Sequence, residues 1–262
     1  MSRGFGGEVA ELYERYRHGY PAEILAAVVD AFALDSRGVA VDLGCGTGQL
    51  ALPLAAVVGA VVGVDPEPDM LIVARRAAER LEVSNASWVI GDDRDLLALG
   101  RALGDRSIAA VTIGQAAHWV DHRMLFDRAR GLLRRGGGVA ILTNGTPLWL
   151  QDSGWSRALR SFLERWLDCE LVDRCGTDNA AQQRYREDLV ALGYEVGGVD
   201  CDWVAELSFD QLLGGVLSAL GVEHLPAGQR RVAFACGLRE AVGSAQSFTE
   251  PVHVALITGR VG

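Results

Sequence analysis

The sequence has no surplus of basic residues. It contains 25 basic residues against 34 acidic ones, which gives a formal net charge of −9 at pH 7. A nucleic-acid-binding protein neutralises phosphates with a basic face, and no long run of basic residues supplies one here. We therefore expect no nucleic-acid partner. The acidic field suits a cationic or neutral small ligand instead.

Cysteine is scarce, and its spacing is not that of a cross-linked or zinc-binding protein. The five cysteines are odd in number and form no Cys-x-x-Cys pair, which argues against a disulfide scaffold and against a zinc site. We interpret them as reduced thiols of a cytoplasmic protein. No metal is expected.

No targeting or membrane-spanning segment is evident. The stretch from Met1 to Phe5 lacks the basic and apolar parts of a signal peptide. Residues 43–64 carry no charge and are long enough to cross a bilayer. However, a glycine-rich turn opens this stretch and Pro53 interrupts it. A strand, turn, helix and strand of a buried parallel sheet explain it better.

Low-complexity tracts and internal repeats are absent too, and what is present is an alternation of strands and helices. Hydrophobic residues make up 49% of the chain and charged residues 23%, which is enough apolar material for a core. Alternation in the first half is typical of a parallel sheet covered by helices. We expect strands at 38–43, 60–64, 86–91, 108–114, 137–143, near 195–204 and at 252–257, and later helices at 153–167, 179–192, 208–220 and 228–242.

This order predicts a single domain over residues 1–262. Helices at 8–34 precede a ligand-binding core at about 35–145. Two later insertions, at about 145–193 and 206–247, are expected to form a cap that faces the substrate.

A glycine-rich turn, Gly44-Cys45-Gly46-Thr47-Gly48, follows the first predicted strand. A turn of this kind between a buried strand and a helix can direct backbone N–H groups at a ligand. The dinucleotide fingerprint would need a third glycine at position 49, which is Gln49, so an NAD-dependent oxidoreductase is disfavoured. Asp42 lies two residues before the first glycine and suits a ligand with an amino group and a positive charge.

Acidic residues also end the next two predicted strands. Asp65 ends the second strand, where a carboxylate can accept hydrogen bonds from two ribose hydroxyls. Asp92 and Asp93 end the third strand, where a carboxylate could accept from an adenine amino group. The alternatives are that Asp65 caps the following helix and that Asp92 and Asp93 are solvated loop acids; Asp95 is assigned as a helix N-cap. Together these residues describe a nucleoside site without a phosphate.

With these motifs the chain resembles a known family, the class I S-adenosylmethionine-dependent methyltransferases. The similarity is specific to the trans-aconitate methyltransferase-like (methyltransferase type 11) branch, which acts on small molecules. It covers residues 5–145 well and the final strand more loosely. It is carried by Val41–Gly48 (first motif), Gly63–Pro66 with Met70-Leu71 (second motif), Gly91–Asp93 (adenine contact), Gln115–Asp121 (Gln-Ala-x-His-Trp-Phe-Asp) and Tyr16–Pro21 (Tyr-Arg-Pro-x-Tyr-Pro, with His18 in place of the first proline).

The resemblance implies a fold, a reaction and a set of contacts. The implied fold is a Rossmann-like, seven-stranded, mostly parallel sheet with an antiparallel last strand, helices on both faces and helical cap insertions. The implied reaction transfers a methyl group from S-adenosylmethionine to a small-molecule acceptor, with oxygen as the first expectation and nitrogen or carbon open. The implied cofactor contacts are Gly44, Cys45 and Gly46 by backbone, Asp65 on the ribose, Asp92 and Asp93 beside the adenine, Pro66 and Met70 near the adenosine, Gln115 at the methionine side, and Arg17 and Tyr20 at the carboxylate end or in a lid.

His118 is the candidate general base, because a histidine just after the fourth strand would lie beside the transferred methyl in this architecture. The alternative is a structural histidine. Trp119, Trp149, Trp155 and Trp166 are candidates for a substrate wall, although tryptophans at helical spacing are more often core. A fold relative that binds S-adenosylmethionine without methyl transfer, such as a cyclase or a sensor, also stays open.

Overall fold

The computed structural model describes residues 4–172 and 175–262, and within these ranges seven strands form one sheet. The strand order is β3-β2-β1-β4-β5-β7-β6. Only β7 runs against its neighbours, pairing antiparallel with both β5 and β6. This confirms the predicted fold class. The strands are β1 Val39–Leu43, β2 Ala60–Asp65, β3 Ala86–Ile90, β4 Ile108–Gly114, β5 Leu133–Asn144, β6 Glu195–Ser208 and β7 Ser247–Arg260.

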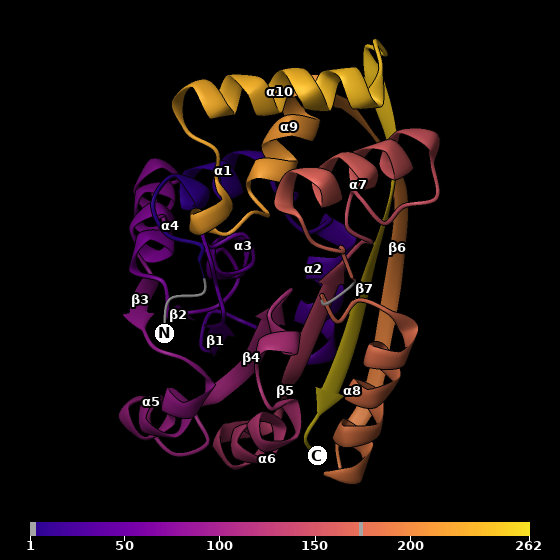
Figure 1. The fold of residues 1–262 in the computed structure, drawn as a ribbon. Coiled ribbons are helices and arrows are strands. Elements are labelled where there is room, and N and C mark those ends of the chain that lie inside the picture. Colours follow the sequence, from indigo (N-terminus) through magenta and orange to yellow (C-terminus); the bar gives the residue numbers. More distant parts are fainter. Residues whose placement is uncertain (1–3, 173–174) are drawn as a thin grey trace.

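Helices surround the sheet, as Figure 1 shows. The last two strands extend past the sheet as a long hairpin that reaches the helices of the cap. The helices are α1 Glu8–Tyr16, α2 Ala22–Ala31, α3 Ala51–Ala55, α4 Pro68–Arg80, α5 Leu96–Leu103, α6 His122–Leu132, α7 Gly154–Leu167, α8 Asn179–Ala191, α9 Phe209–Leu217 and α10 Gly228–Val242, with single 3-10 turns η1 Asp93–Asp95, η2 Ala117–Trp119 and η3 Val222–His224.

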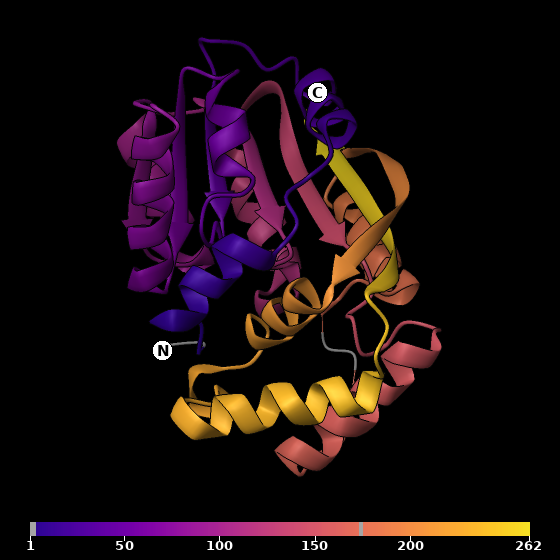
Figure 2. The same ribbon diagram turned by 90° about the horizontal axis from the view of Figure 1, so that it is seen from above.

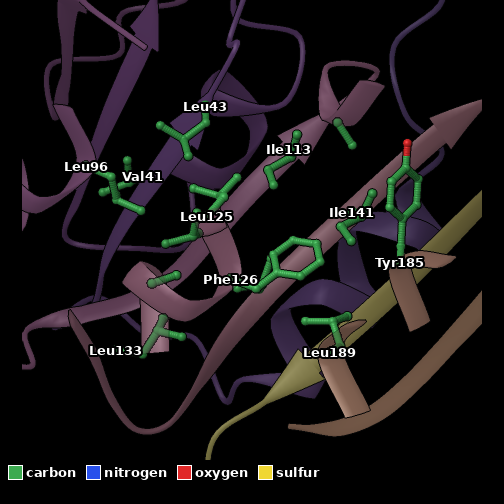
Figure 3. Packing of buried hydrophobic residues seen from close by; sticks show 14 of the residues in the cluster. Val41, Leu43, Leu96, Ile113, Leu125, Phe126, Leu133, Ile141, Tyr185 and Leu189 are labelled. Atoms are coloured by element: carbon green, nitrogen blue, oxygen red, sulfur yellow. The ribbon is translucent and has the colours of Figure 1, made fainter. Parts of the chain in front are cut away.

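Alternate residues of the central strands supply two cores, one on each face of the sheet. Val41 and Leu43 of β1 face the helices α5, α6 and α8, whereas Ala40 faces α2 and α3. This is the period-two pattern of a strand that is buried on both sides. Figure 3 shows the first core, in which Phe126 of α6 and Leu189 of α8 pack beside Ile141 and its neighbours.

A third core joins α7, α9 and α10 to the far ends of β6 and β7. Phe162, Phe234 and Leu212 are buried in it, and Figure 2 shows α7 and α10 at one end of the molecule, away from the sheet. These three helices form the cap. Within the predicted cap segment 145–193, α8 instead packs on the sheet, because Tyr185 and Leu189 belong to the first core.

Helix α1 bridges the cap and the first half of the sheet. Its Tyr16 hydroxyl donates to Asp210 of α9 at 3.0 Å, and the Tyr16 ring covers Gly214, where a Cβ atom would approach the ring to 2.4 Å. On its other side, Glu11 and Glu14 pair with arginines of α4. The cap and the sheet are thus connected through α1 as well as through the hairpin.

In the described ranges, no helix combines the length and apolarity needed to cross a membrane. All five cysteines are free thiols. Among the described residues, no cluster of His, Cys, Asp and Glu is arranged to hold a metal ion.

Candidate functional site

The glycine-rich turn after β1 is tied to the end of β2. The N–H groups of Gly44 and Cys45 both donate to the carbonyl of Val64, at 2.8 and 3.1 Å. The N–H of Gly46 donates to Asp65 Oδ2 at 2.9 Å. These donors therefore stabilise the turn itself, which corrects the expectation that they are directed at a ligand.

Close packing explains why the turn needs glycine at its first position. Gly44 has φ +67°, and a Cβ atom there would lie 2.5 Å from the Cβ of Ala116. Ala116 belongs to the segment that follows β4. The backbone that follows β1 thus packs directly against the segment that follows β4, and a side chain at position 44 would not fit between them.

Asp65 is buried at the carboxyl end of β2, with 7% of its surface exposed. Its Oδ1 accepts the N–H of Glu67 and its Oδ2 accepts the N–H of Gly46, both at 2.9 Å. These two hydrogen bonds to a charged acceptor orient the carboxylate. Helix α4 begins later, with Glu67 at its N-cap position, so Asp65 is not its N-cap.

Aromatic side chains from the N-terminal segment cover this edge of the sheet. The Tyr13 ring lies over Gly46, 4.0 Å from the position of a Cβ atom there. The Tyr20 hydroxyl lies against Gly114 at the end of β4, 2.5 Å from a Cβ atom built at that glycine. Burial raises the pKa of both phenols, so they remain protonated. Tyr13 was not among the predicted site residues. Its position in the predicted helical segment 8–34 does not show that its ring covers the turn.

Arg17 lies between these two tyrosines in the chain and carries one buried donor without a partner among the described residues. Its guanidinium carbon is 5.5 Å from the centroid of the Tyr13 ring. Its Nε is buried without a hydrogen-bond partner among the described residues. A cation with an unpaired buried donor at this position fits an anionic group of a ligand.

The second-motif residues lie beside the same edge. Met70 is buried in a small cluster with Phe5, Ala10 and Tyr13. Pro66 is half-buried next to Asp65. Both therefore lie close to the turn, as expected for residues near a bound nucleoside.

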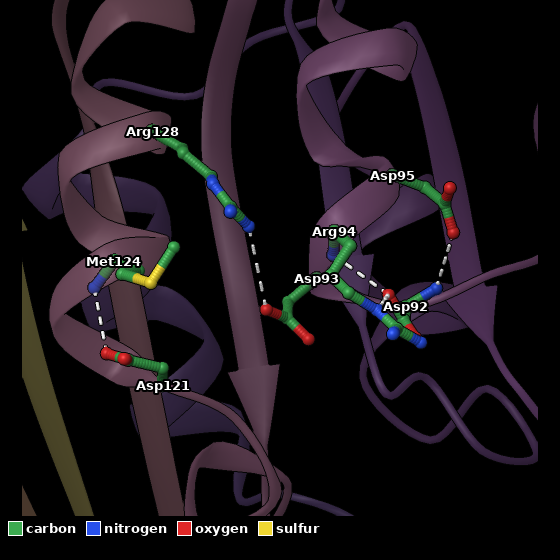
Figure 4. A network of polar contacts seen from close by, with 7 residues as sticks. All are labelled: Asp92, Asp93, Arg94, Asp95, Asp121, Met124 and Arg128. Atoms are coloured by element: carbon green, nitrogen blue, oxygen red, sulfur yellow. Dashed lines mark hydrogen bonds and ion pairs between the residues drawn. The ribbon is translucent and has the colours of Figure 1, made fainter. Parts of the chain in front are cut away.

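The acids after β3 are engaged in local contacts, which Figure 4 shows. Asp92 is the N-cap of η1: it accepts the N–H of Arg94 and pairs with that guanidinium. Asp95 closes the capping box by accepting the N–H of Asp92 at 3.0 Å. It occupies the N-cap position of α5, as expected, although its side chain makes no capping hydrogen bond to that helix. Asp93 lies 3.8 Å from the guanidinium of Arg128 on α6. Their role toward an adenine stays a prediction.

Gln115 and His118 follow β4 on a strained turn. Gln115 has φ +55°, and its side-chain amide donates to the carbonyl of Asn144 at 2.6 Å. Positive φ is uncommon for a residue other than glycine and is frequent at functional sites. His118 is half-buried in η2, beneath Gly176, where a Cβ atom would be 2.9 Å from the Cβ of His118. The base role of His118 is not decided by these contacts.

The candidate tryptophans differ in exposure. Trp149, Trp155 and Trp166 pack in the cap core. Trp119 is 48% exposed, so it is the tryptophan of this group that is open to solvent.

Asp42 is buried inside the sheet below the turn. It is 1% exposed, and its Oδ1 accepts the hydroxyl of Thr112 on β4 at 2.8 Å, while its Oδ2 has no hydrogen-bond partner among the described residues. Burial raises the pKa of Asp42 to about 7, partly opposed by the Thr112 hydrogen bond. The carboxyl group thus links β1 to β4 and does not reach a ligand's amino group directly.

Comparisons with known proteins agree on one family. A methyltransferase domain matches residues 40–137. An uncharacterized methyltransferase of Mycobacterium tuberculosis is 35% identical over 165 residues, which are 63% of this chain and 60% of that protein. A second uncharacterized methyltransferase, from Mycobacterium bovis, is 30% identical over 149 residues, which are 56% of this chain and 68% of that protein. The match therefore spans about three fifths of the first relative's length.

Solved structures show the same fold over nearly the whole chain. A proposed type II methyltransferase from Anaeromyxobacter dehalogenans superposes with a TM-score of 0.59 at 19% identity, covering 94% of this chain and 97% of that one. At this identity the similarity concerns the fold alone.

The buried Asp42 generates a prediction about pH. Its pKa is about 7 in the folded protein and 3.8 ordinarily, so its contribution to stability is complete below the ordinary pKa and is lost as the pH rises through the folded pKa. From pH ~5 to ~8, the free energy of unfolding of the wild type should fall by roughly 3 kcal/mol relative to that of Asp42→Asn. Urea denaturation across this range measures the difference, with the exposed Asp105→Asn as control. A difference that does not vary with pH would contradict the account.

Proposed function

The chain belongs to the class I S-adenosylmethionine-dependent methyltransferase family, and on this premise we propose that it transfers a methyl group from S-adenosylmethionine to a small-molecule acceptor. The observation that carries the proposal is the Asp65 carboxylate, oriented by two backbone N–H groups beside the glycine turn. Its position at the end of β2 and its orientation match what a ribose requires.

The residues at the carboxyl edge fit the cofactor. Asp65 would accept hydrogen bonds from the ribose hydroxyls, and the backbone of Gly44, Cys45 and Gly46 would lie along the bound molecule. The unpaired Nε of Arg17 would meet the carboxylate of the methionine part. Supporting contacts are assigned to Tyr20 beside Arg17, Pro66 and Met70 near the adenosine, Asp92 and Asp93 near the adenine, and Gln115 near the methionine part.

The acceptor is held so that its nucleophilic atom attacks the methyl carbon in line with the carbon–sulfur bond. We expect this atom to be an oxygen first. Bound S-adenosylmethionine supplies a methyl carbon on a positively charged sulfur, and S-adenosylhomocysteine is the product. The acceptor oxygen forms the new bond to carbon as the carbon–sulfur bond breaks, its electron pair passing to sulfur. His118 takes the hydroxyl proton on a ring nitrogen. The phenols of Tyr13 and Tyr20, whose pKa values burial raises, donate hydrogen bonds and are poor bases.

Other features support a small acceptor in a reducing compartment. The net charge of −9 disfavours a nucleic acid. The five free thiols are usual for the cytoplasm, where we place the protein. The oligomeric state is not part of the proposal.

Removing the charge of Asp65 tests the cofactor site. In Asp65→Asn, the amide oxygen still accepts one backbone N–H, but the charge-assisted bonds to the ribose are lost, so affinity for S-adenosylhomocysteine should fall about tenfold to a hundredfold. Isothermal titration calorimetry measures the change. Asp35→Asn is the matched control: Asp35 precedes β1, at the opposite edge of the sheet, and this variant should bind as the wild type does. Equal affinity in Asp65→Asn would remove the basis of the proposal.

His118→Ala tests the base. With a phenol or alcohol acceptor selected by S-adenosylhomocysteine formation, kcat should fall about a hundredfold or more, because the hydroxyl proton loses its acceptor. Affinity for S-adenosylhomocysteine should stay the same. The exposed His224→Ala serves as control. An unchanged kcat in His118→Ala would return His118 to a structural role.

A further inference from the structure

A groove of about 460 Å³ lies beyond the carboxyl end of β5. Thr146 and Gln151, on the segment between β5 and α7, line one side, and Asp202, Trp203 and His253 of the β6–β7 hairpin line the other. Its volume is within the usual range of small-molecule pockets. None of these residues has been assigned to the cofactor.

Hydrogen bonds connect the groove to the reacting end of the cofactor site. The side chain of Gln115, just after β4, donates to the carbonyl of Asn144. The next residue, Gly145, donates its N–H to the carbonyl of His253 at 2.7 Å. The groove is therefore adjacent, along the carboxyl edge of the sheet, to the point where the methyl group is expected.

Gln151 presents an unused acceptor at the groove wall. The residue is 6% exposed, and its Nε2 donates to the carbonyl of Thr146 at 3.3 Å. Its Oε1 is buried and has no hydrogen-bond partner among the described residues. Buried amide oxygens are normally paired, so a ligand that donates a hydrogen bond here would complete the site.

The opposite wall carries a carboxylate that is held in place by a histidine. Asp202 Oδ1 lies 2.7 Å from His253 Nδ1. Because a carboxylate only accepts, this contact places the proton on Nδ1. The second oxygen of Asp202 receives no hydrogen bond in the described part of the chain.

Charge and apolar surface define the ligand that fits between these walls. The other acid of the groove, Asp152, forms an ion pair with Arg157 at 2.6 Å. Asp202 is therefore the carboxylate of the groove that we expect to bind a cationic ligand. Leu150, Val252 and Trp203 supply apolar surface. An ammonium would donate to Asp202 and to Gln151 and lie near the Trp203 ring, a favourable partner for cations. The carboxylates of Asp152 and Asp202 disfavour an anion here.

We propose that this groove binds the methyl acceptor, and that the acceptor is a small apolar molecule whose amine is recognised by Asp202 and Gln151. The part of this proposal that makes the bound molecule the acceptor rests on the proposed function. The amine is the recognition group, and the hydroxyl oxygen proposed above is the methylated atom. Phenols that carry an alkylamine tail are the substrate class that combines both groups.

Three phenols that differ only in their tails test the recognition. We would titrate tyramine, 4-ethylphenol and 3-(4-hydroxyphenyl)propionate by calorimetry into the full chain, with and without S-adenosylhomocysteine. The wild type should bind tyramine about tenfold more tightly than either of the others. Asp202→Asn and Gln151→Met should lose this preference while binding 4-ethylphenol as before.

Asp200→Asn is the matched control. Asp200 is two residues earlier on β6, on the same face of the strand and exposed, but it does not line the groove. This variant should keep the tyramine preference. The proposal is overturned if no phenol binds at millimolar concentration, if the propionate binds best, or if Asp202→Asn keeps the preference. Any of these results together with normal S-adenosylhomocysteine binding leaves the proposed function standing, whereas failure to bind S-adenosylhomocysteine contradicts the proposed function itself.

Discussion

The candidate site depends on the hydrogen bond between the Gly46 N–H and the carboxylate of Asp65. Through its other oxygen the same carboxylate holds the N–H of Glu67, just before α4. One side chain thus fixes the end of β2, the turn after β1 and the approach to α4. Bonds from an N–H to a charged acceptor are stronger than those between neutral groups. The backbone hydrogen bonds therefore fix the orientation of the Asp65 carboxylate before a ligand binds.

The N-terminal segment makes this edge of the sheet part of a larger assembly. Tyr13 covers the turn, whereas Tyr16, almost one helical turn further on, packs on Gly214 of the cap. Because α1 contacts both the turn and the cap, we expect a change in the position of the cap to shift α1 against the glycine turn.

Much of the sheet and the turn could be predicted because their signals are local. Buried strands of five or six residues, a Gly-x-Gly-x-Gly turn and an acid at a strand end each occupy a short stretch of sequence. The contacts that give the site its chemistry join distant segments: Asp202 meets His253 across the hairpin, and Gln115 reaches Asn144. No short pattern encodes such pairs.

Two differences from the expectations share this cause. The N–H groups of the turn are used by Val64 and Asp65, which follows from the closeness of two strands and not from the glycine spacing. Helix α8 lies on the sheet because Tyr185 and Leu189 complete a core made mostly of earlier residues. Its own sequence is only weakly amphipathic and does not show which of the two locations it takes.

Hydrogen–deuterium exchange of the full chain, with and without saturating S-adenosylhomocysteine, tests the central claim most directly. At short exchange times the account predicts slower exchange at residues 44–49 and along α1, Glu8–Tyr16, because the ligand would lie between the glycine turn and its aromatic cover. Exchange in α5 and α6, on the far face of the sheet, should change little. Unchanged exchange at the turn, or protection confined to other elements, would contradict the assignment of this edge as the cofactor site.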